Sequence, residues 1–146
     1  RFVFHGFTPP SPYKSIDTLK IARKVFRFDS NKLNDLGESL GLGKKLPTTG
    51  FDLWSRCMKG VLSAWKIMKA YNIQDVLLLE KVYNKFKAWD KSHPNLSLYT
   101  HTDGCPVCRS LQIQKRGFDY RLVTVKQRFT CTSCGTWWSR KIVKAK

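Results

Sequence analysis

Two short motifs near the C-terminus, Cys105-Pro106-Val107-Cys108 and Cys131-Thr132-Ser133-Cys134, decide the fold of the last part of this chain. They are separated by 22 residues. Pairs at this spacing are typical of a tetrahedral Zn²⁺ site, in which each tight turn supplies two thiolates. The segment between them is long enough for a β-hairpin. We therefore expect a zinc ribbon held by structural zinc, with Cys105, Cys108, Cys131 and Cys134 as ligands.

Two disulfide bonds are the alternative use of these thiols. The chain has five cysteines, an odd number, and residues 1–10 lack the apolar run and cleavage site of a secretory signal. We therefore favour zinc, in an intracellular, reducing compartment, either cytoplasm or nucleus. Cys57 has no partner pattern and is expected in a hydrophobic core. His101 precedes the first motif and is expected to be a loop residue.

The charge of the chain points to a polyanionic partner. The 146 residues include 27 Lys and Arg but only 10 Asp and Glu, a net charge of +17. Residues 105–146 alone carry ten basic residues and one acidic residue. Nucleic acid is the expected partner of such a surface. An anionic membrane surface is the alternative, but no basic amphipathic helix supports it, and no apolar run is long enough to span a membrane.

Nine residues of the ribbon and tail are candidates for contact with nucleic acid. Basic side chains would bind phosphates, and a tryptophan would stack on a base. Packing within the protein is the alternative role of the tryptophans, and we expect it for at least one of them. The candidates are Lys115, Arg116, Arg121, Lys126, Arg128, Trp137, Trp138, Arg140 and Lys141. Lys141, Lys144 and Lys146 form a basic tail at the end of the sequence.

Short elements are expected on both sides of one long helix. Prolines impose an extended path on residues 1–15. A short strand end that runs into a helix is expected over 16–26, and helices are expected from 33 to 40 and over 51–59. Ser30 or Asn31 would cap the second of these helices, and Gly41 would end it. Residues 93–104 read as a linker. In the ribbon, strands are expected at 111–114, 120–125 and 127–130, with a turn at 116–119.

The long element spans residues 61–89. At 100° per residue, a set of apolar side chains falls on one arc: Val61, Trp65, Met68, Val76, Leu79, Tyr83 and Phe86. Asp75 lies at the edge of this predicted buried arc, where a carboxylate is costly unless it is paired or bound to a metal. Tyr71 lies one turn earlier on the same side.

The stretch from Trp65 to Tyr83, with Tyr71 and Asp75 in a Tyr-x-x-x-Asp arrangement, resembles the third motif of the DEDD superfamily of 3′–5′ exonucleases. Residues 16–22 and 31–41 also resemble the segments before that motif in phage-type members, which have an RNase H-like fold. The resemblance implies that residues 1–92 are the mostly helical C-terminal half of an exonuclease domain. With a linker at 93–104 and the zinc ribbon with its basic tail at 105–146, the chain is expected to be α+β.

The resemblance also implies roles for two side chains. Asp75 would be a ligand of a catalytic Mg²⁺ or Mn²⁺ pair, and Tyr71 would orient the attacking water. The first motif of the family, Asp-x-Glu, has no match here, and of four metal-binding carboxylates only Asp75 is present. The chain would therefore be inactive unless a missing N-terminal half, on the same or a separate polypeptide, completed it. A non-catalytic zinc-ribbon protein that binds DNA or RNA is the alternative.

Overall fold

A computed structural model describes residues 2–9 and 11–142 of the chain, so Lys144 and Lys146 lie outside the described residues. The helices are η1 (Phe2–His5, a 3₁₀ helix), α1 (Thr18–Val25), α2 (Leu33–Ser39), α3 (Phe51–Met58), α4 (Leu62–Phe86), η2 (Lys87–Trp89, also 3₁₀) and α5 (Leu96–Tyr99). The strands are β1 (Ile113–Tyr120), β2 (Val125–Cys131) and β3 (Trp137–Lys141). The α+β class is confirmed. Among the described residues, no helix is long and apolar enough to cross a membrane.

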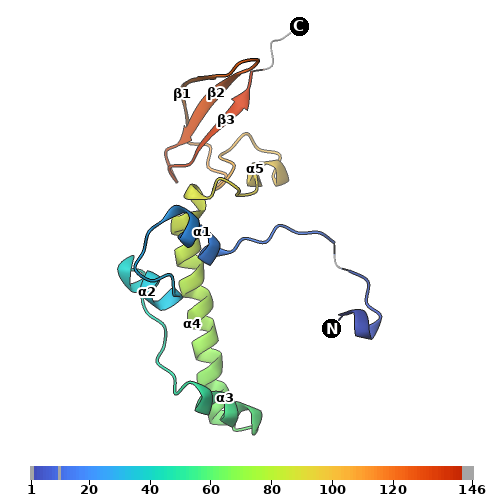
Figure 1. Ribbon diagram of the computed structural model, residues 1–146, viewed down its shortest axis with the longest axis vertical. Coiled ribbons are helices and arrows are strands. Elements are labelled where there is room, and N and C mark those ends of the chain that lie inside the picture. The colour runs from blue at the N-terminus through green and yellow to red at the C-terminus, as the bar shows by residue number, and fades with distance from the viewer. Residues whose placement is uncertain (1, 10, 143–146) are drawn as a thin grey trace.

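Helix α4 is the spine of the helical part, with α1 and α2 beside one half and α3 beside the other (Figure 1). Its buried side chains form one stripe, spaced four residues apart except for a gap of ten between Met68 and Leu78: Ala64, Met68, Leu78, Val82 and Phe86. Ala64 and Met68 pack against α3 in one cluster. Val82 and Phe86 pack against α1 and α2 in another. One face of α4 therefore serves two separate small cores.

The predicted buried arc of the long helix is wrong for four of its members. Val61 is 36% exposed, Trp65 53%, Val76 64% and Leu79 41%, whereas Met68 and Phe86 are buried as expected. Apolar side chains cover more than one face of this helix. Periodicity therefore cannot identify which of the apolar faces the short helices cover.

The ends of the first two helices follow local chemistry only in part. Asp17 caps α1, since its carboxylate accepts hydrogen bonds from two backbone amides of the first turn at 2.9 and 3.3 Å. The prediction that Ser30 or Asn31 caps α2 is wrong, because the N-cap residue is Lys32 and no side chain caps this end. Gly41 adopts the expected left-handed conformation after α2, with φ of 65°.

The ribbon has three antiparallel strands in the order β1-β2-β3, but not the predicted three. The expected turn at 116–119 lies inside β1, where the register shifts between Lys115 and Phe118 as in a β-bulge. The expected strand at 120–125 is instead mostly the hairpin turn, closed by a 2.9 Å bond from Arg121 N to Thr124 O. The third strand, β3, comes from the predicted tail. Gly117 adopts φ of 68°, which permits the bulge. A glycine in this position also favours a turn, and the sequence pattern therefore predicts the end of the hairpin here.

The predicted linker at 93–104 contains α5 and is attached at both ends. Tyr83 on α4 stacks on His93, and the Tyr83 hydroxyl lies 2.7 Å from His93 Nε2. At the other end, the backbone N–H of Leu96 donates to the carbonyl of Pro106 at 2.7 Å. The first cysteine motif is thus connected to the end of α4 through ordered contacts. The sheet lies beyond this end of the helix (Figure 1).

Candidate metal centre and basic sheet face

The four predicted cysteines form one cluster. Their Sγ atoms all lie within 4.8 Å of one another, and Cys105 to Cys134 and Cys108 to Cys131 are each separated by 3.6 Å. All five cysteines of the chain are free thiols. Cys57 is buried with Leu53, Ala64 and Met68, as expected for a core thiol. The four clustered cysteines could hold a metal ion.

The two cysteine turns have the same backbone structure. In the first, Cys105 N donates to Ser110 O at 2.8 Å and Arg109 N to Cys105 O at 2.9 Å. In the second, Cys131 N donates to Thr136 O and Gly135 N to Cys131 O, both at 2.9 Å. The residue after each second cysteine is left-handed, with φ of 64° at Arg109 and 76° at Gly135. Two equivalent turns thus present two sulfurs each from opposite sides.

The protonation of the cluster is unequal. Burial raises the pKa of Cys108 to about 12 and also raises the pKa of Cys105. Burial acts in the same direction on Cys131, but the backbone N–H groups of Cys134 and Ser133, together with neighbouring thiols, bring its pKa to about 7. Adjacent thiols cannot all ionise, because thiolates at this separation repel one another. A cation among them would displace the remaining protons, since the thiolate is the form that binds metal.

Four of the nine predicted nucleic-acid contacts lie on one face of the sheet. Residues directly opposite in antiparallel strands point to the same side. Lys126 lies opposite Lys141, Arg128 opposite Ser139, and Thr130 opposite Trp137. Since Lys126, Arg128 and Thr130 alternate along β2, they share a face. This basic face is defined by Lys126, Arg128, Trp137 and Lys141. Trp137 is 59% exposed on it.

Three other predicted residues lie on the opposite face. Lys115 lies opposite Phe129, and Phe129 lies opposite Trp138. The rings of Trp138 and Phe129 stack at 5.6 Å, and Trp138 also packs against the cysteine cluster. Arg140 lies over the Phe129 ring and forms a 3.1 Å ion pair with Asp103. Trp138 therefore takes the packing role that we expected for at least one tryptophan.

The last two predicted contacts lie near the hairpin and engage neighbours on the same strand. Arg116 donates to the side-chain oxygen of Gln114 at 2.6 Å. Arg121 forms a 3.0 Å ion pair with Asp119.

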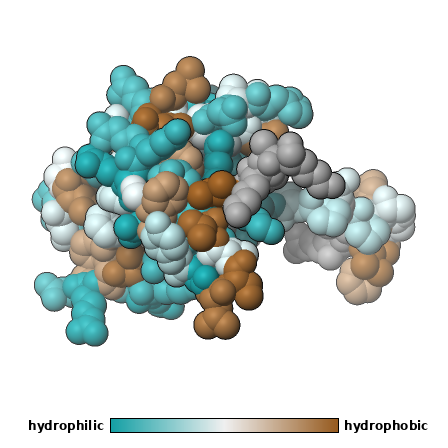
Figure 2. Space-filling model, turned by 90° about the horizontal axis from the view of Figure 1, so that it is seen from above, coloured by the Kyte–Doolittle hydropathy of each residue, from teal (hydrophilic) through white to brown (hydrophobic). Residues whose placement is uncertain are grey.

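Seen from the end of the molecule that carries the sheet, the surface is mostly hydrophilic, with separate hydrophobic groups between the hydrophilic ones (Figure 2).

Tyr71 and Asp75 lie together between the two cores of α4, and Lys45 covers them. The Lys45 ammonium is 2.7 Å from Asp75 Oδ2 and 3.0 Å from the Tyr71 hydroxyl. Hydrogen bonds to Asp75 and Tyr71 raise the pKa of Lys45 above its ordinary value, although burial opposes this. Asp75 Oδ1 is buried and has no hydrogen-bond partner among the described residues. The carboxylate is therefore neutralised on one oxygen only.

Sequence reasoning missed Lys45 as the partner of Asp75. Lys45 lies 30 positions before Asp75 in a loop without periodicity, so no local signal connects them. It also missed Gly104, where an added Cβ would lie 2.4 Å from the carbonyl oxygen of Arg109. The signal that could have identified this close approach was a glycine directly before Cys105.

No protein-family model, curated protein or solved structure matches this chain.

The equivalent cysteine turns predict opposite effects for two matched substitutions. Gly135→Ala places a Cβ in the left-handed region and should lower the free energy of unfolding of the Zn²⁺-supplemented protein by about 1 kcal/mol. Arg109→Gly removes such a Cβ and should raise it by a smaller amount, because glycine also gains freedom in the unfolded chain. Chemical denaturation measures both effects.

Arg109→Gln is the control, since it removes the same charge but keeps the Cβ. It should leave the free energy of unfolding nearly unchanged. A loss of stability in Arg109→Gly, or a gain in Gly135→Ala, would contradict the equivalence of the two turns.

Proposed function

We propose that residues 105–142 form a zinc ribbon that binds nucleic acid through its basic face. The observation that carries this proposal is the meeting of Lys126, Arg128 and Lys141 with the exposed Trp137 on one side of a small sheet. Cations that neutralise phosphates next to an aromatic ring on which a base can stack are the usual components of a single-strand binding surface.

Zinc is the proposed metal because of the donor set and the size of the cluster. Four thiolates at a Zn–S distance of about 2.3 Å around one tetrahedral ion lie about 3.8 Å apart. Two sulfur pairs at 3.6 Å, and all four within 4.8 Å, fit a single ion of this kind. An iron–sulfur cluster also takes four cysteines, but it needs room for several atoms between the sulfurs.

The zinc proposal predicts one Zn²⁺ per chain. Native mass spectrometry of protein purified without added metal is expected to give this stoichiometry, and chelation should unfold the sheet, because the cysteine cluster is the principal core of the ribbon. Helix α4 and its two cores do not include the cluster, so helical circular dichroism should survive. A metal-free protein with two disulfide bonds would exclude the zinc ribbon.

The basic face predicts that nucleic-acid binding depends on salt and on a few residues of this face. Lys126→Gln combined with Arg128→Gln should weaken binding to a single-stranded oligonucleotide. It should also reduce the slope of log affinity against log salt by about 1.5, since two phosphate contacts are lost. Fluorescence anisotropy between roughly 50 and 200 mM salt measures this slope. Trp137→Leu should lower affinity about tenfold with little effect on the slope.

The matched control combines Lys66→Gln with Lys85→Gln, which removes two charges from exposed positions on α4. It should lower affinity less than the sheet variant does. Equal losses for the two variants would mean that net charge, rather than the basic face, governs binding.

A second candidate function is that of a metal-dependent 3′–5′ exonuclease part, to which α4 contributes Tyr71 and Asp75. Two observations favour it. Asp75 presents a buried oxygen without a partner, which an additional cation could use. A second, exposed apolar face runs along the same helix: Leu62, Trp65, Ile73, Val76 and Leu79. A helix that is apolar on two sides is usually covered on both, and the missing half of an exonuclease domain would supply that cover.

This second candidate has its own test. The chain with Mg²⁺ or Mn²⁺ should not shorten a 3′-labelled oligonucleotide, because it has one of the four carboxylates needed. With an added polypeptide that carries the Asp-x-Glu motif, trimming should appear and fall by orders of magnitude in Asp75→Asn, which keeps the shape of the side chain. Asp52→Asn, an exposed carboxylate on α3, is the control. Normal trimming by Asp75→Asn would end the exonuclease hypothesis.

A further inference from the structure

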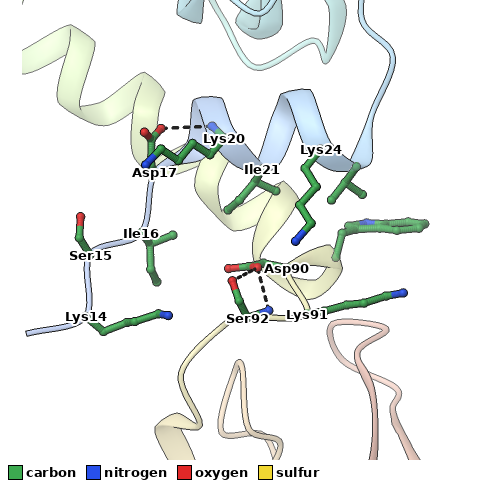
Figure 3. Close-up of a pocket in the computed structure, with 12 residues that line it drawn as sticks. Lys14, Ser15, Ile16, Asp17, Lys20, Ile21, Lys24, Asp90, Lys91 and Ser92 are labelled. Atoms are coloured by element: carbon green, nitrogen blue, oxygen red, sulfur yellow. Dashed lines mark hydrogen bonds between the residues drawn. The ribbon is translucent and has the colours of Figure 1, made fainter.

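A groove lies between α1, the segment that leads into it, and the turn after η2 (Figure 3). Its volume is about 720 Å³, within the range of small-molecule sites. The cysteine cluster and the basic face contribute no residue to its lining. It is therefore distinct from the surface already described.

Lysines dominate the charge of this groove. Four line it: Lys14, Lys20, Lys24 and Lys91. Lys14 and Lys24 point into the space from two sides (Figure 3). Among the described residues, none of the four forms an ion pair. The lining holds four lysines against two aspartates, so its net charge is positive and attracts an anion placed in the groove.

Two carboxylates also line the groove, but both already accept hydrogen bonds. Asp17 accepts from the first turn of α1 at 2.9 and 3.3 Å. Asp90 accepts from the backbone N–H and the hydroxyl of Ser92, at 2.9 and 2.7 Å. Their positions are set by local turns of the chain. Each of these carboxylates accepts through Oδ1 alone, and among the described residues neither forms an ion pair with a lysine of the groove.

The lining of the groove also includes apolar side chains and an aromatic ring. Ile16, Ile21 and Val25 line it together with Trp89, which is 61% exposed. Trp89 meets Phe26 edge to face at a centroid distance of 5.7 Å, and this contact holds the ring while much of it stays accessible. A ligand that fits this groove has a flat, partly apolar part and an anionic part.

We propose that this groove binds one nucleotide of a single-stranded nucleic acid, with the base against Trp89 and the phosphate near the lysines of the lining. The inference deepens the proposed function and rests on it, since the same strand would also reach the basic face. A nucleotide can stack its base and bind its phosphate in the same place, whereas a free anion has no base to stack.

Calorimetric titration of the zinc-loaded chain with adenosine 5′-monophosphate tests the proposal. The nucleotide should bind at least about tenfold more tightly than adenosine or inorganic phosphate, because each of these lacks one of the two contacts. Lys20→Gln combined with Lys24→Gln should weaken its binding about tenfold. Trp89→Leu should do the same, with circular dichroism to confirm that both variants fold.

Two matched variants separate this proposal from the one on the ribbon. Lys66→Gln with Lys85→Gln should bind the nucleotide as the unmodified chain does, whereas Lys126→Gln with Arg128→Gln should remove only the part of the binding that Lys20→Gln with Lys24→Gln leaves. Unchanged binding by the Lys20/Lys24 variant would overturn the groove proposal, as would inorganic phosphate or an oligoglutamate peptide that binds as tightly as the nucleotide. In each case the salt-dependent binding of an oligonucleotide by the basic face would stand or fall separately.

Discussion

The convergence of four sulfur atoms within 4.8 Å is the constraint on which the basic face depends. Apart from these cysteines, the buried cluster of the ribbon holds Val107, with Trp138 packed beside it. So small a core cannot fix the register of three strands against the entropy of about forty residues. A metal ion held by the cluster would fix both cysteine turns at once, and with them the strand that places Trp137 beside Arg128 and Lys126.

The helical part depends on a different constraint, which is the use of one face of α4 by two separate cores. Between them, at the level of Tyr71 and Asp75, the stripe turns polar, and Lys45 supplies the positive charge that a half-buried carboxylate needs. This ion pair fastens the loop after α2 to the spine. The other oxygen of this carboxylate, Oδ1, is buried and has no hydrogen-bond partner among the described residues.

The two candidate nucleic-acid surfaces share a chemical design but differ in what supports them. The basic face lies on the sheet next to the cysteine cluster, whereas the groove lies between α1, the segment that leads into it and the turn after η2, close to the aromatic contacts of Phe26. The ordered connection through Tyr83 and His93 links the end of α4 to the first cysteine turn. A single strand that reached both surfaces would gain from their effective concentration.

Local spacing predicted the cysteine cluster, because each Cys-x-x-Cys turn has its own local geometry. Local chemistry likewise predicted the left-handed Gly41. The buried side of α4, the third strand and the partner of Asp75 were decided only by tertiary structure. An apolar residue such as Trp65 has the same periodicity whether or not a neighbour covers it, and Lys45 meets Asp75 only after a loop has closed across 30 positions. Burial and long-range pairing depend on which surfaces meet, and no local pattern encodes that.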